Sequence, residues 1–261
     1  MHPVLTVLHW GGVTRPIGSY GVLLAFALAL GSALTVRATN RAGYDEGAII
    51  SALAGAIGLG FVGAYLAAAL VAWVQTGAPG QPAIMFYGGA AAGTLAYAQL
   101  ARRFGVPAGS ALDLALPGFP IAHALGRIGC LLGGCCYGAP SALPWAIVYT
   151  HPLAPAAAGA HARHPWPLYE ALCLLALAGL FARAARRSVA PGKRAAQYAL
   201  AYAAVRCSLE PLRGDAVRGV FCGGLLSTGQ LCAFASALIA LGFLWLRRPG
   251  PATLCASGEA V

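Results

Sequence analysis

SALAGAIGLGFVGAYLAAAL, residues 51–70, is an uninterrupted apolar run without a charged side chain. An α-helix rises about 1.5 Å per residue, so a run of this length crosses the roughly 30 Å hydrocarbon core of a bilayer. A backbone in lipid must satisfy its own hydrogen bonds, which a helix does. The segment therefore predicts a transmembrane helix, and its glycines and alanines predict close packing against neighbouring helices.

Similar apolar runs recur along the chain. Its 261 residues are 59% hydrophobic and 9% charged, with a mean hydropathy of +0.72, whereas a soluble domain carries roughly 25% charged residues. The runs are continuous rather than alternating, which favours helices over a membrane β-barrel. We predict an all-α, polytopic membrane protein that forms a single domain, because no polar linker divides it. The seven predicted spans lie near residues 17–36, 47–74, 84–101, 108–126, 168–182, 195–210 and 225–246.

The basic residues predict the orientation of these spans. Most of the 17 Lys and Arg residues follow every second span, which assigns that side to the cytoplasm. The N-terminus is then outside and the C-terminus inside. This topology accounts for the net charge of +10 without a nucleic-acid partner. The opening MHPVLTVLHWGGVTRP lacks the basic region and cleavage site of a removable signal peptide.

Two arginines, Arg127 and Arg206, fall within or at the outer end of predicted spans. An ionisable side chain costs at least roughly 2.5 kcal/mol in the bilayer centre, so it normally has a partner and a role. Arg206 and Glu210 are four residues apart and share a helix face. This pair is interpreted equally well as a structural ion pair between spans or as part of a binding site.

Arg127 has a more specific setting. Gly126 and Gly129 flank it and let a backbone or a ligand approach, and His123 lies one helical turn earlier. Arg213 is predicted on the same outer side. Guanidinium groups match phosphate oxygens with paired hydrogen bonds, so the two arginines predict an anion site. At this depth a phospholipid headgroup is favoured over a soluble anion.

The stretch RHPWPLYEA, residues 163–171, places Tyr169 and Glu170 at the outer entrance of the fifth span. A tyrosine at a membrane interface is ordinary. A carboxylate there requires a cation, for which Arg127 and Arg206 are the available groups.

Four of the eight cysteines are predicted on the outer side: Cys130, Cys135, Cys136 and Cys222. In an oxidising compartment a disulfide among them is the leading interpretation. A reactive thiol activated by a neighbouring arginine ranks second. A metal site ranks third, because the spacing lacks a matching second cluster, and we predict no metal.

Four motifs in matching order resemble the bacterial prolipoprotein diacylglyceryl transferases. SYGVLLAFALALG is similar to the family's opening Tyr-Gly helix, and GRIGCLLGGCCYG resembles the signature G-R-x-G-N-F-x-N-x-E-x-x-G. RHPWPLYEA and VRCSLEPLRGDA…LLSTGQ resemble the R-H-P-x-Q-L-Y-E and R-x-x-x-E-x-x-R-x-x-D…S-x-G-Q segments. The matching positions include Tyr20, Gly126, Arg127, Gly129, Gly138, Tyr169, Glu170, Arg206, Glu210 and Arg213.

The resemblance implies an enzyme that transfers diacylglyceryl from phosphatidylglycerol to the lipobox cysteine of a prolipoprotein signal peptide. It implies a multi-pass protein of the bacterial inner membrane without a cofactor. Arg127 and Arg213 would hold the headgroup phosphate, and the other matching positions would shape the lipid site.

Several positions depart from the family pattern. A histidine usual before a Gly-Gly pair is replaced by Tyr87, so His123 is the alternative base. In the signature, Cys130 and Cys135 replace an asparagine and a glutamate. These departures leave two other interpretations: a non-catalytic scaffold that binds anionic lipid, and a transferase with another acceptor. A transporter is disfavoured, because no charged residue is predicted to be buried in the cytoplasmic half of the spans.

Overall fold

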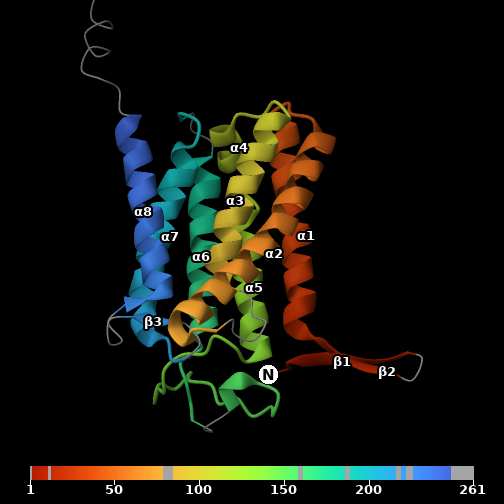
Figure 1. Cartoon of the computed structure of the whole chain (residues 1–261), viewed down its shortest axis with the longest axis vertical. Helices are drawn as coiled ribbons and strands as arrows, with labels where there is room; N and C mark the ends of the chain where they lie inside the picture. The colour runs from red at the N-terminus through yellow and green to blue at the C-terminus, as the bar shows by residue number, and fades with distance from the viewer. Residues whose placement is uncertain are drawn as a thin grey trace, which may run out of the picture.

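Each segment that the sequence predicts as a span contains an α-helix, and the fourth segment contains one helix and part of a second. The computed structural model describes residues 2–10, 13–78, 85–157, 161–185, 189–215, 219–221 and 226–247. Its long helices run roughly parallel or antiparallel in one bundle (Figure 1). The helices are α1 (Ser19–Arg41), α2 (Glu46–Thr76), α3 (Phe86–Arg103), α4 (Ala108–Ala115), α5 (Phe119–Gly133), α6 (Trp166–Ala184), α7 (Lys193–Leu209) and α8 (Thr228–Leu246).

Within the described ranges, four helices are long and apolar enough to cross a membrane by length and composition: α1, α2, α6 and α8. The bent pair of α4 and α5 raises this number to five if the pair counts as one span. Helix α7 has 17 residues, and the 18 residues of α3 include two arginines in the last turn. The chain is thus a multi-pass membrane protein, while seven crossings remain a prediction.

The predicted fourth span, 108–126, is not one straight helix. Helices α4 and α5 meet at an angle of 48°, and the second of them continues to Gly133. Pro117 in the break lacks a backbone N–H. At Gly118 an added Cβ would lie 2.1 Å from the carbonyl oxygen of Gly31, so helix α1 packs directly against the break. The GRIG segment, residues 126–129, lies inside α5.

The all-α prediction omits two small antiparallel sheets. Strands β1 (Val4–Trp10) and β2 (Val13–Gly18) form a hairpin before α1, and β3 (Val220–Phe221) pairs with β4 (Leu226–Ser227) before α8. Two short 3-10 helices complete the list, at Pro155–Ala157 and Glu210–Leu212. The hairpin extends sideways from the base of α1, at the end of the bundle where the chain begins (Figure 1).

Small residues allow α2 and α3 to pack closely, as the sequence predicts. An added Cβ at Gly88 would lie 2.6 Å from the carbonyl oxygen of Gly63, so α2 and α3 touch through their backbones. At this separation only glycine, which has no Cβ, fits at these two positions. Such close packing is expected in a membrane, because the hydrophobic effect does not drive helices together in lipid.

Helix α7 begins at a cap supplied by another helix. Its own cap residue, Gly192, has a φ of 85° and no side chain to accept a hydrogen bond. The carboxylate of Asp113 in α4 accepts instead from the backbone N–H groups of Gly192 at 2.9 Å and Ala195 at 2.8 Å. This long-range cap fixes α4 to the start of α7 and also satisfies the helix dipole.

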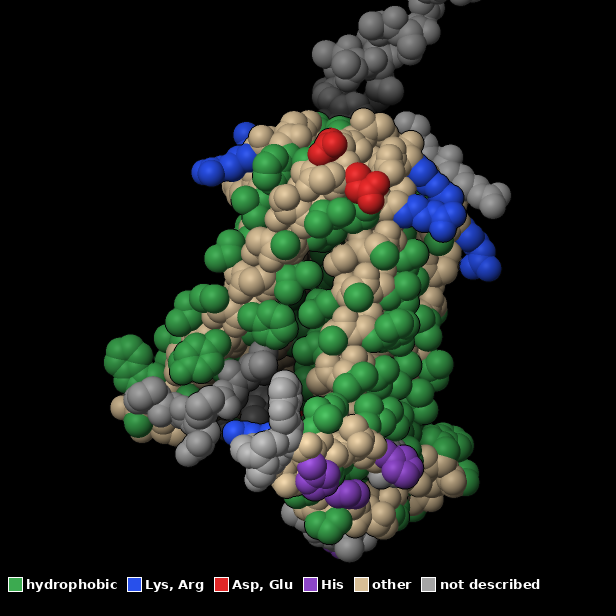
Figure 2. Space-filling model, turned by 90° about the vertical axis from the view of Figure 1, so that its right-hand side faces the viewer, with side chains coloured by type: hydrophobic (Ala, Val, Ile, Leu, Met, Phe, Trp, Pro, Cys, Tyr) green, Lys and Arg blue, Asp and Glu red, His purple; other side chains and the backbone are tan. Residues whose placement is uncertain are grey.

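The two ends of the bundle differ in charge. One end, which we call the basic end, holds the last turns of α1, α3, α6 and α8 (Figure 1). Most of the visible Lys and Arg side chains gather there, the visible His side chains lie at the opposite end, and a mainly hydrophobic surface separates the two (Figure 2). We call the opposite end the signature end, because α5 ends there with the GRIGCLLGG segment.

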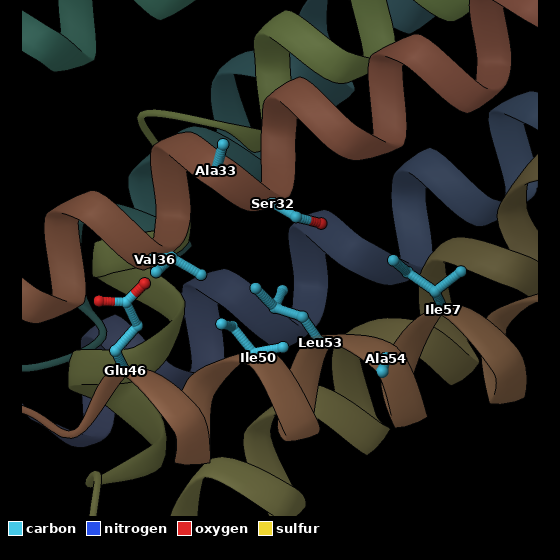
Figure 3. Close-up of a pocket in the computed structure, with 8 residues that line it drawn as sticks. All are labelled: Ser32, Ala33, Val36, Glu46, Ile50, Leu53, Ala54 and Ile57. Atoms are coloured by element: carbon cyan, nitrogen blue, oxygen red, sulfur yellow. The ribbon is translucent and has the colours of Figure 1, made fainter.

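A groove between α1 and α2 is lined by eight residues (Figure 3), among them Glu46, which begins α2 next to the basic end. Its volume is about 400 Å³, and its walls are almost entirely apolar apart from Ser32 and Glu46. It lies far along the bundle from the signature end and is not the functional site described below.

Candidate functional site

Three arginines surround one buried tryptophan at the signature end. The guanidinium carbons of Arg127, Arg206 and Arg213 lie 5.4, 4.9 and 4.9 Å from the centroid of the Trp166 ring. Trp166 has no solvent exposure, and its indole N–H donates to the carbonyl oxygen of Leu209 at 2.7 Å. A desolvated cation over an aromatic face gains roughly 2 kcal/mol. One ring therefore contacts all three guanidinium groups, which come from α5, from α7 and from the segment after α7.

Arg127 is paired as the sequence predicts. Its Nε lies 2.7 Å from Oε2 of Glu170, and both side chains are buried. The other carboxylate oxygen of Glu170 accepts a hydrogen bond from the Tyr202 hydroxyl at 2.7 Å. Glu170 thus joins α5, α6 and α7, and removing it would leave a buried guanidinium uncompensated.

Arg206 and Glu210 form the ion pair that their spacing predicts, through Nη1 and Oε2. Within the described part of the chain, Nε and Nη2 of Arg206 are buried without a hydrogen-bond partner. Gly229, in the first turn of α8, lies against this guanidinium, and an added Cβ there would lie 2.4 Å from Nη2. The arginine therefore offers two unused donors close to a helix N-terminus, which favours an anion.

Arg213 is held by backbone pairing with the end of the signature. The N–H of Ala139 donates to the carbonyl of Leu212 at 2.8 Å, and the N–H of Gly214 donates to Tyr137 at 3.1 Å. Gly138 forms a β-bridge with Arg213 itself. This pairing brings a residue that follows α7 next to the loop that follows α5.

Asp215 accepts a hydrogen bond from Nη2 of Arg213 at 2.8 Å. Burial lowers the pKa of Arg213, but the hydrogen bond and the charge of Asp215 outweigh burial and raise that pKa above its usual value. The guanidinium therefore stays charged at any physiological pH.

His123 lies one turn before Arg127 on α5 and is enclosed by rings. It stacks on Phe86 at a centroid distance of 4.1 Å and meets Tyr202 edge-on at 5.2 Å. Its Nε2 lies 3.9 Å from Oε1 of Glu170, and neither ring nitrogen has a hydrogen-bond partner among the described residues. An imidazole with free nitrogens beside a carboxylate can accept a proton.

Tyr87, the residue at the family's histidine position, lies in the first turn of α3 with a buried hydroxyl. It is close enough to Arg206 and Glu170 for their charges to act on it. The structure thus brings both predicted proton acceptors, Tyr87 and His123, to the same cluster.

The three described cysteines of the signature gather beside Arg127. Cys130, Cys135 and Cys136 are free thiols, and their sulfur atoms all lie within 4.8 Å of one another. Nη1 of Arg127 lies 4.0 Å from Sγ of Cys136. Hydrogen bonds from the Cys130 and Cys135 thiols hold the pKa of Cys136 well below its usual range. The predicted fourth member, Cys222, lies outside the described residues, and a disulfide remains a prediction.

The predicted glycines have different surroundings. Gly129 lies against the ring of Tyr20, so it allows α1 and α5 to approach. An added Cβ at Gly138 would lie 2.5 Å from Cβ of His164, whereas one at Gly126 would meet no atom within 4 Å. Gly138 is therefore required by packing, and Gly126 leaves open space beside Arg127.

Two predicted tyrosines lie outside the arginine cluster. Tyr20 begins α1 and is 38% exposed. The Tyr169 hydroxyl accepts a hydrogen bond from the indole of Trp145 at 2.8 Å and lies 3.3 Å from Nδ1 of His164. Tyr169 therefore orders the loop before α6 and does not contact the guanidinium groups through any described hydrogen bond.

The sequence does not single out Trp166 or Tyr202 as site residues, whereas Asp215 falls within the closing motif that resembles the family pattern. Trp166 lies within a quoted motif, but a tryptophan near a membrane interface is ordinary. Tyr202 precedes Arg206 by four residues, so the helical spacing that pairs Arg206 with Glu210 also identifies its face. The convergence on Trp166 depends on tertiary packing and has no signal in the sequence.

The fold and the site define a helical membrane protein with a buried arginine cluster at one end of its bundle. A model of the family described as prolipoprotein diacylglyceryl transferase matches residues 7–246. The chain belongs to this family, which confirms the resemblance of its motifs.

Three relatives illustrate the similarity, and each is named phosphatidylglycerol–prolipoprotein diacylglyceryl transferase. The one from Clostridium tetani is 28% identical over 86% of this chain and 91% of its own length. The one from Gloeobacter violaceus is 34% identical over 67% and 65%. The one from Clostridium perfringens, whose name ends in the numeral 2, is 28% identical over 88% of this chain and 90% of its own length.

Proposed function

We propose that this protein transfers the diacylglyceryl group of phosphatidylglycerol to the cysteine thiol of a prolipoprotein lipobox. The observation that carries the proposal is the convergence of Arg127, Arg206 and Arg213 on Trp166. The family and the names of the relatives supply the reaction class.

The reaction is a displacement at carbon. The acceptor thiolate attacks the glycerol carbon that carries the phosphate ester, a C–S bond forms and the C–O bond breaks. The electron pair of the C–O bond leaves with glycerol phosphate, whose charge rises from −1 in the diester to −2. Donors that bind the phosphate therefore bind more strongly as the bond breaks, which is the condition for catalysis.

The arginines supply those donors in this proposal. Arg213 and Arg127 would bind phosphate oxygens, and the unused Nε and Nη2 of Arg206 would add a third contact. Their carboxylate partners hold the guanidinium groups in place before lipid binds, which limits the reorganisation that the transition state requires.

The thiol must lose a proton before it attacks, because the thiolate is the nucleophile. His123 is the acceptor that this proposal favours, since its ring nitrogens are free and Glu170 lies beside it to stabilise the imidazolium. Tyr87 is the second candidate and borders the same cluster.

In a bacterial inner membrane the signature end would face outward. The basic end carries Arg41, Arg103, Arg183 and Arg247, which the positive-inside rule assigns to the cytoplasm. The substrate peptide, whose lipobox emerges on the outer side of the membrane, would then reach the arginine cluster.

The test is thioether formation on a lipobox peptide by purified protein in phosphatidylglycerol micelles, followed by mass spectrometry. We expect product with the wild type, and a rate lowered by about 10² or more in Arg127→Ala and in Arg213→Ala. Arg102→Ala, at the basic end, is the matched control and keeps the wild-type rate. Absence of product from folded wild type would remove the catalytic proposal and favour the non-catalytic lipid-binding scaffold. Product with another thiol but not with the peptide would indicate a different acceptor.

A further inference from the structure

We propose that Cys130, Cys135 and Cys136 form a zinc site with three protein ligands and an open fourth position. The sulfur atoms of the three residues all lie within 4.8 Å of one another. Two of the residues are half-buried and one is buried, so an ion can enter from the signature end while most water is excluded.

The spacing suits a single ion. Zinc–sulfur bonds are about 2.3 Å long, so sulfur atoms around one tetrahedral zinc are roughly 3.8 Å apart. The observed separations, all within 4.8 Å, exceed this value by no more than about 1 Å. Thiolates are also the ligands that zinc and other soft cations prefer over carboxylates.

The cluster has three cysteines, and this number favours a metal site over a disulfide. A disulfide joins two sulfurs and leaves the third thiol beside Arg127, whereas one zinc ion uses all three. Cys135 and Cys136 are adjacent in sequence, and the N–H of Cys135 donates to the carbonyl of Cys130 at 3.1 Å. This turn brings all three side chains to one place.

The backbone of the turn is specialised for this arrangement. Gly134 ends α5 in the left-handed region with a φ of 70°, and Cys136 has a φ of 53°. Among the described residues Cys136 is the sole non-glycine residue with a positive φ. Such a conformation costs about 1 kcal/mol or more and persists only where the surroundings require it. At Cys136 it turns the side chain back toward α5.

The positively charged guanidinium of Arg127 lies beside the three thiols. Nη1 of Arg127 lies 4.0 Å from Sγ of Cys136 and can donate a hydrogen bond to a thiolate there. Zinc with three thiolates carries a net charge of −1, which the guanidinium stabilises. Partners of this kind orient metal ligands and tune the ion.

This inference rests on the proposed function for its chemical role. Zinc sites with three protein ligands and an open position are typical of catalysis, whereas structural sites use four ligands. The acceptor thiol would take the fourth position, and a thiol bound to zinc loses its proton. The proton would pass to His123, directly or through water, and the thiolate sulfur would attack the glycerol carbon while glycerol phosphate leaves. The metal would thus compensate for the histidine that Tyr87 replaces.

Metal binding is measured first, independently of activity. The reduced protein in detergent is stripped with a chelator, dialysed and titrated with Zn²⁺ and with Co²⁺. We expect one Zn²⁺ per chain, and a sulfur-to-cobalt charge-transfer band with the intense visible absorption of tetrahedral Co²⁺. Absence of saturable Zn²⁺ binding by the reduced wild type would overturn the proposal.

Variants identify the ligands. Cys135→Ser and Cys136→Ser should weaken Zn²⁺ binding by at least about tenfold, whereas Cys207→Ser on α7 should bind as the wild type does. Cys136→His supplies an imidazole nitrogen, which also binds zinc, so it should bind Zn²⁺ more tightly than Cys136→Ser even if both variants are less stable. Equal binding by wild type, Cys135→Ser and Cys136→Ser would contradict the assignment.

The transfer assay separates this inference from the proposed function. Stripped wild type should lose at least about 90% of its transfer rate and regain the rate when Zn²⁺ is added. Transfer that continues unchanged in protein shown to hold no metal would overturn the catalytic role of zinc and leave the proposed function intact. Stoichiometric zinc binding without any transfer would support the metal site and remove the reaction.

Discussion

Trp166 is the residue on which the site depends most. Its ring contacts the guanidinium groups of Arg127, Arg206 and Arg213, which would otherwise repel one another in a medium of low dielectric constant. Glu170, Glu210 and Asp215 each pair with one of these arginines. The cluster is therefore close to neutral before lipid binds. An arriving phosphate finds Nε and Nη2 of Arg206 unused by the described residues but must compete with carboxylates for the donors of the other two arginines. That competition favours an anion whose charge increases during the reaction.

Replacing Trp166 with phenylalanine tests the role of the indole. The smaller ring loses the hydrogen bond to Leu209 and weakens each cation–π contact, by about 1 to 2 kcal/mol in total. We expect the transfer rate to fall about tenfold with the helical content of the protein unchanged, as measured by mass spectrometry of product and by circular dichroism. Trp73→Phe, on the exposed face of α2, is the control and keeps the wild-type rate. Equal rates for both variants would show that Trp166 only fills space.

The sequence identifies the charged residues of the site but not how the fold brings them together. Spacing along one helix predicts the pair of Arg206 and Glu210, and the scarcity of partners predicts a cation for Glu170. Both pairs are present. No local pattern reveals that Arg213 returns to the signature through backbone pairing, or that the three thiols lie within 4.8 Å of one another. Those arrangements depend on the turn after α5, where Gly134 and Cys136 adopt positive φ.

At the scale of elements, the break between α4 and α5 positions the site. Hydropathy predicts one span over 108–126, because apolar composition is continuous through the break. Pro117 and the contact of Gly118 with α1 change the direction of the chain by 48°. The bend sets the direction of α5, and His123, Arg127 and Cys130 lie on the buried face of this helix.

Asp113 joins the other half of this bent pair to α7, so its loss should weaken the bundle. Asp113→Ala removes the acceptor for two backbone N–H groups at the start of α7. We expect a loss of about 1 kcal/mol, within the range of about 0.5 to 2 kcal/mol measured for helix caps, seen as a lower thermal unfolding temperature in detergent. Asp113→Asn retains one acceptor oxygen and should fall between alanine and the wild type. An unchanged unfolding temperature in Asp113→Ala would show that water replaces the cap.

At the scale of the whole molecule, the two ends of the bundle determine its orientation. The basic end and the signature end are separated by a mainly hydrophobic surface (Figure 2). Such a distribution positions the chain across a bilayer, and the excess of arginine at one end predicts which way it faces.

Cysteine labelling tests this orientation in intact cells. Leu153, in the loop before α6, is 65% exposed, and Lys193 begins α7 at the basic end. We expect a membrane-impermeant maleimide to add one label to Leu153→Cys and none to Lys193→Cys, compared with the parent protein. Permeabilised cells should label both variants. The reverse pattern in intact cells would place the arginine cluster on the cytoplasmic side.

Retention of lipid by the purified protein tests most directly whether the arginine cluster binds an anionic headgroup. Native mass spectrometry of protein extracted from an equal mixture of phosphatidylglycerol and phosphatidylcholine counts the lipid that stays bound. We expect the wild type to retain phosphatidylglycerol at least about tenfold over phosphatidylcholine, a preference of about 1.4 kcal/mol, and the variant with both Arg127→Ala and Arg213→Ala to lose it. Equal retention of both lipids by the wild type, or an unchanged preference in the double variant, would contradict the account.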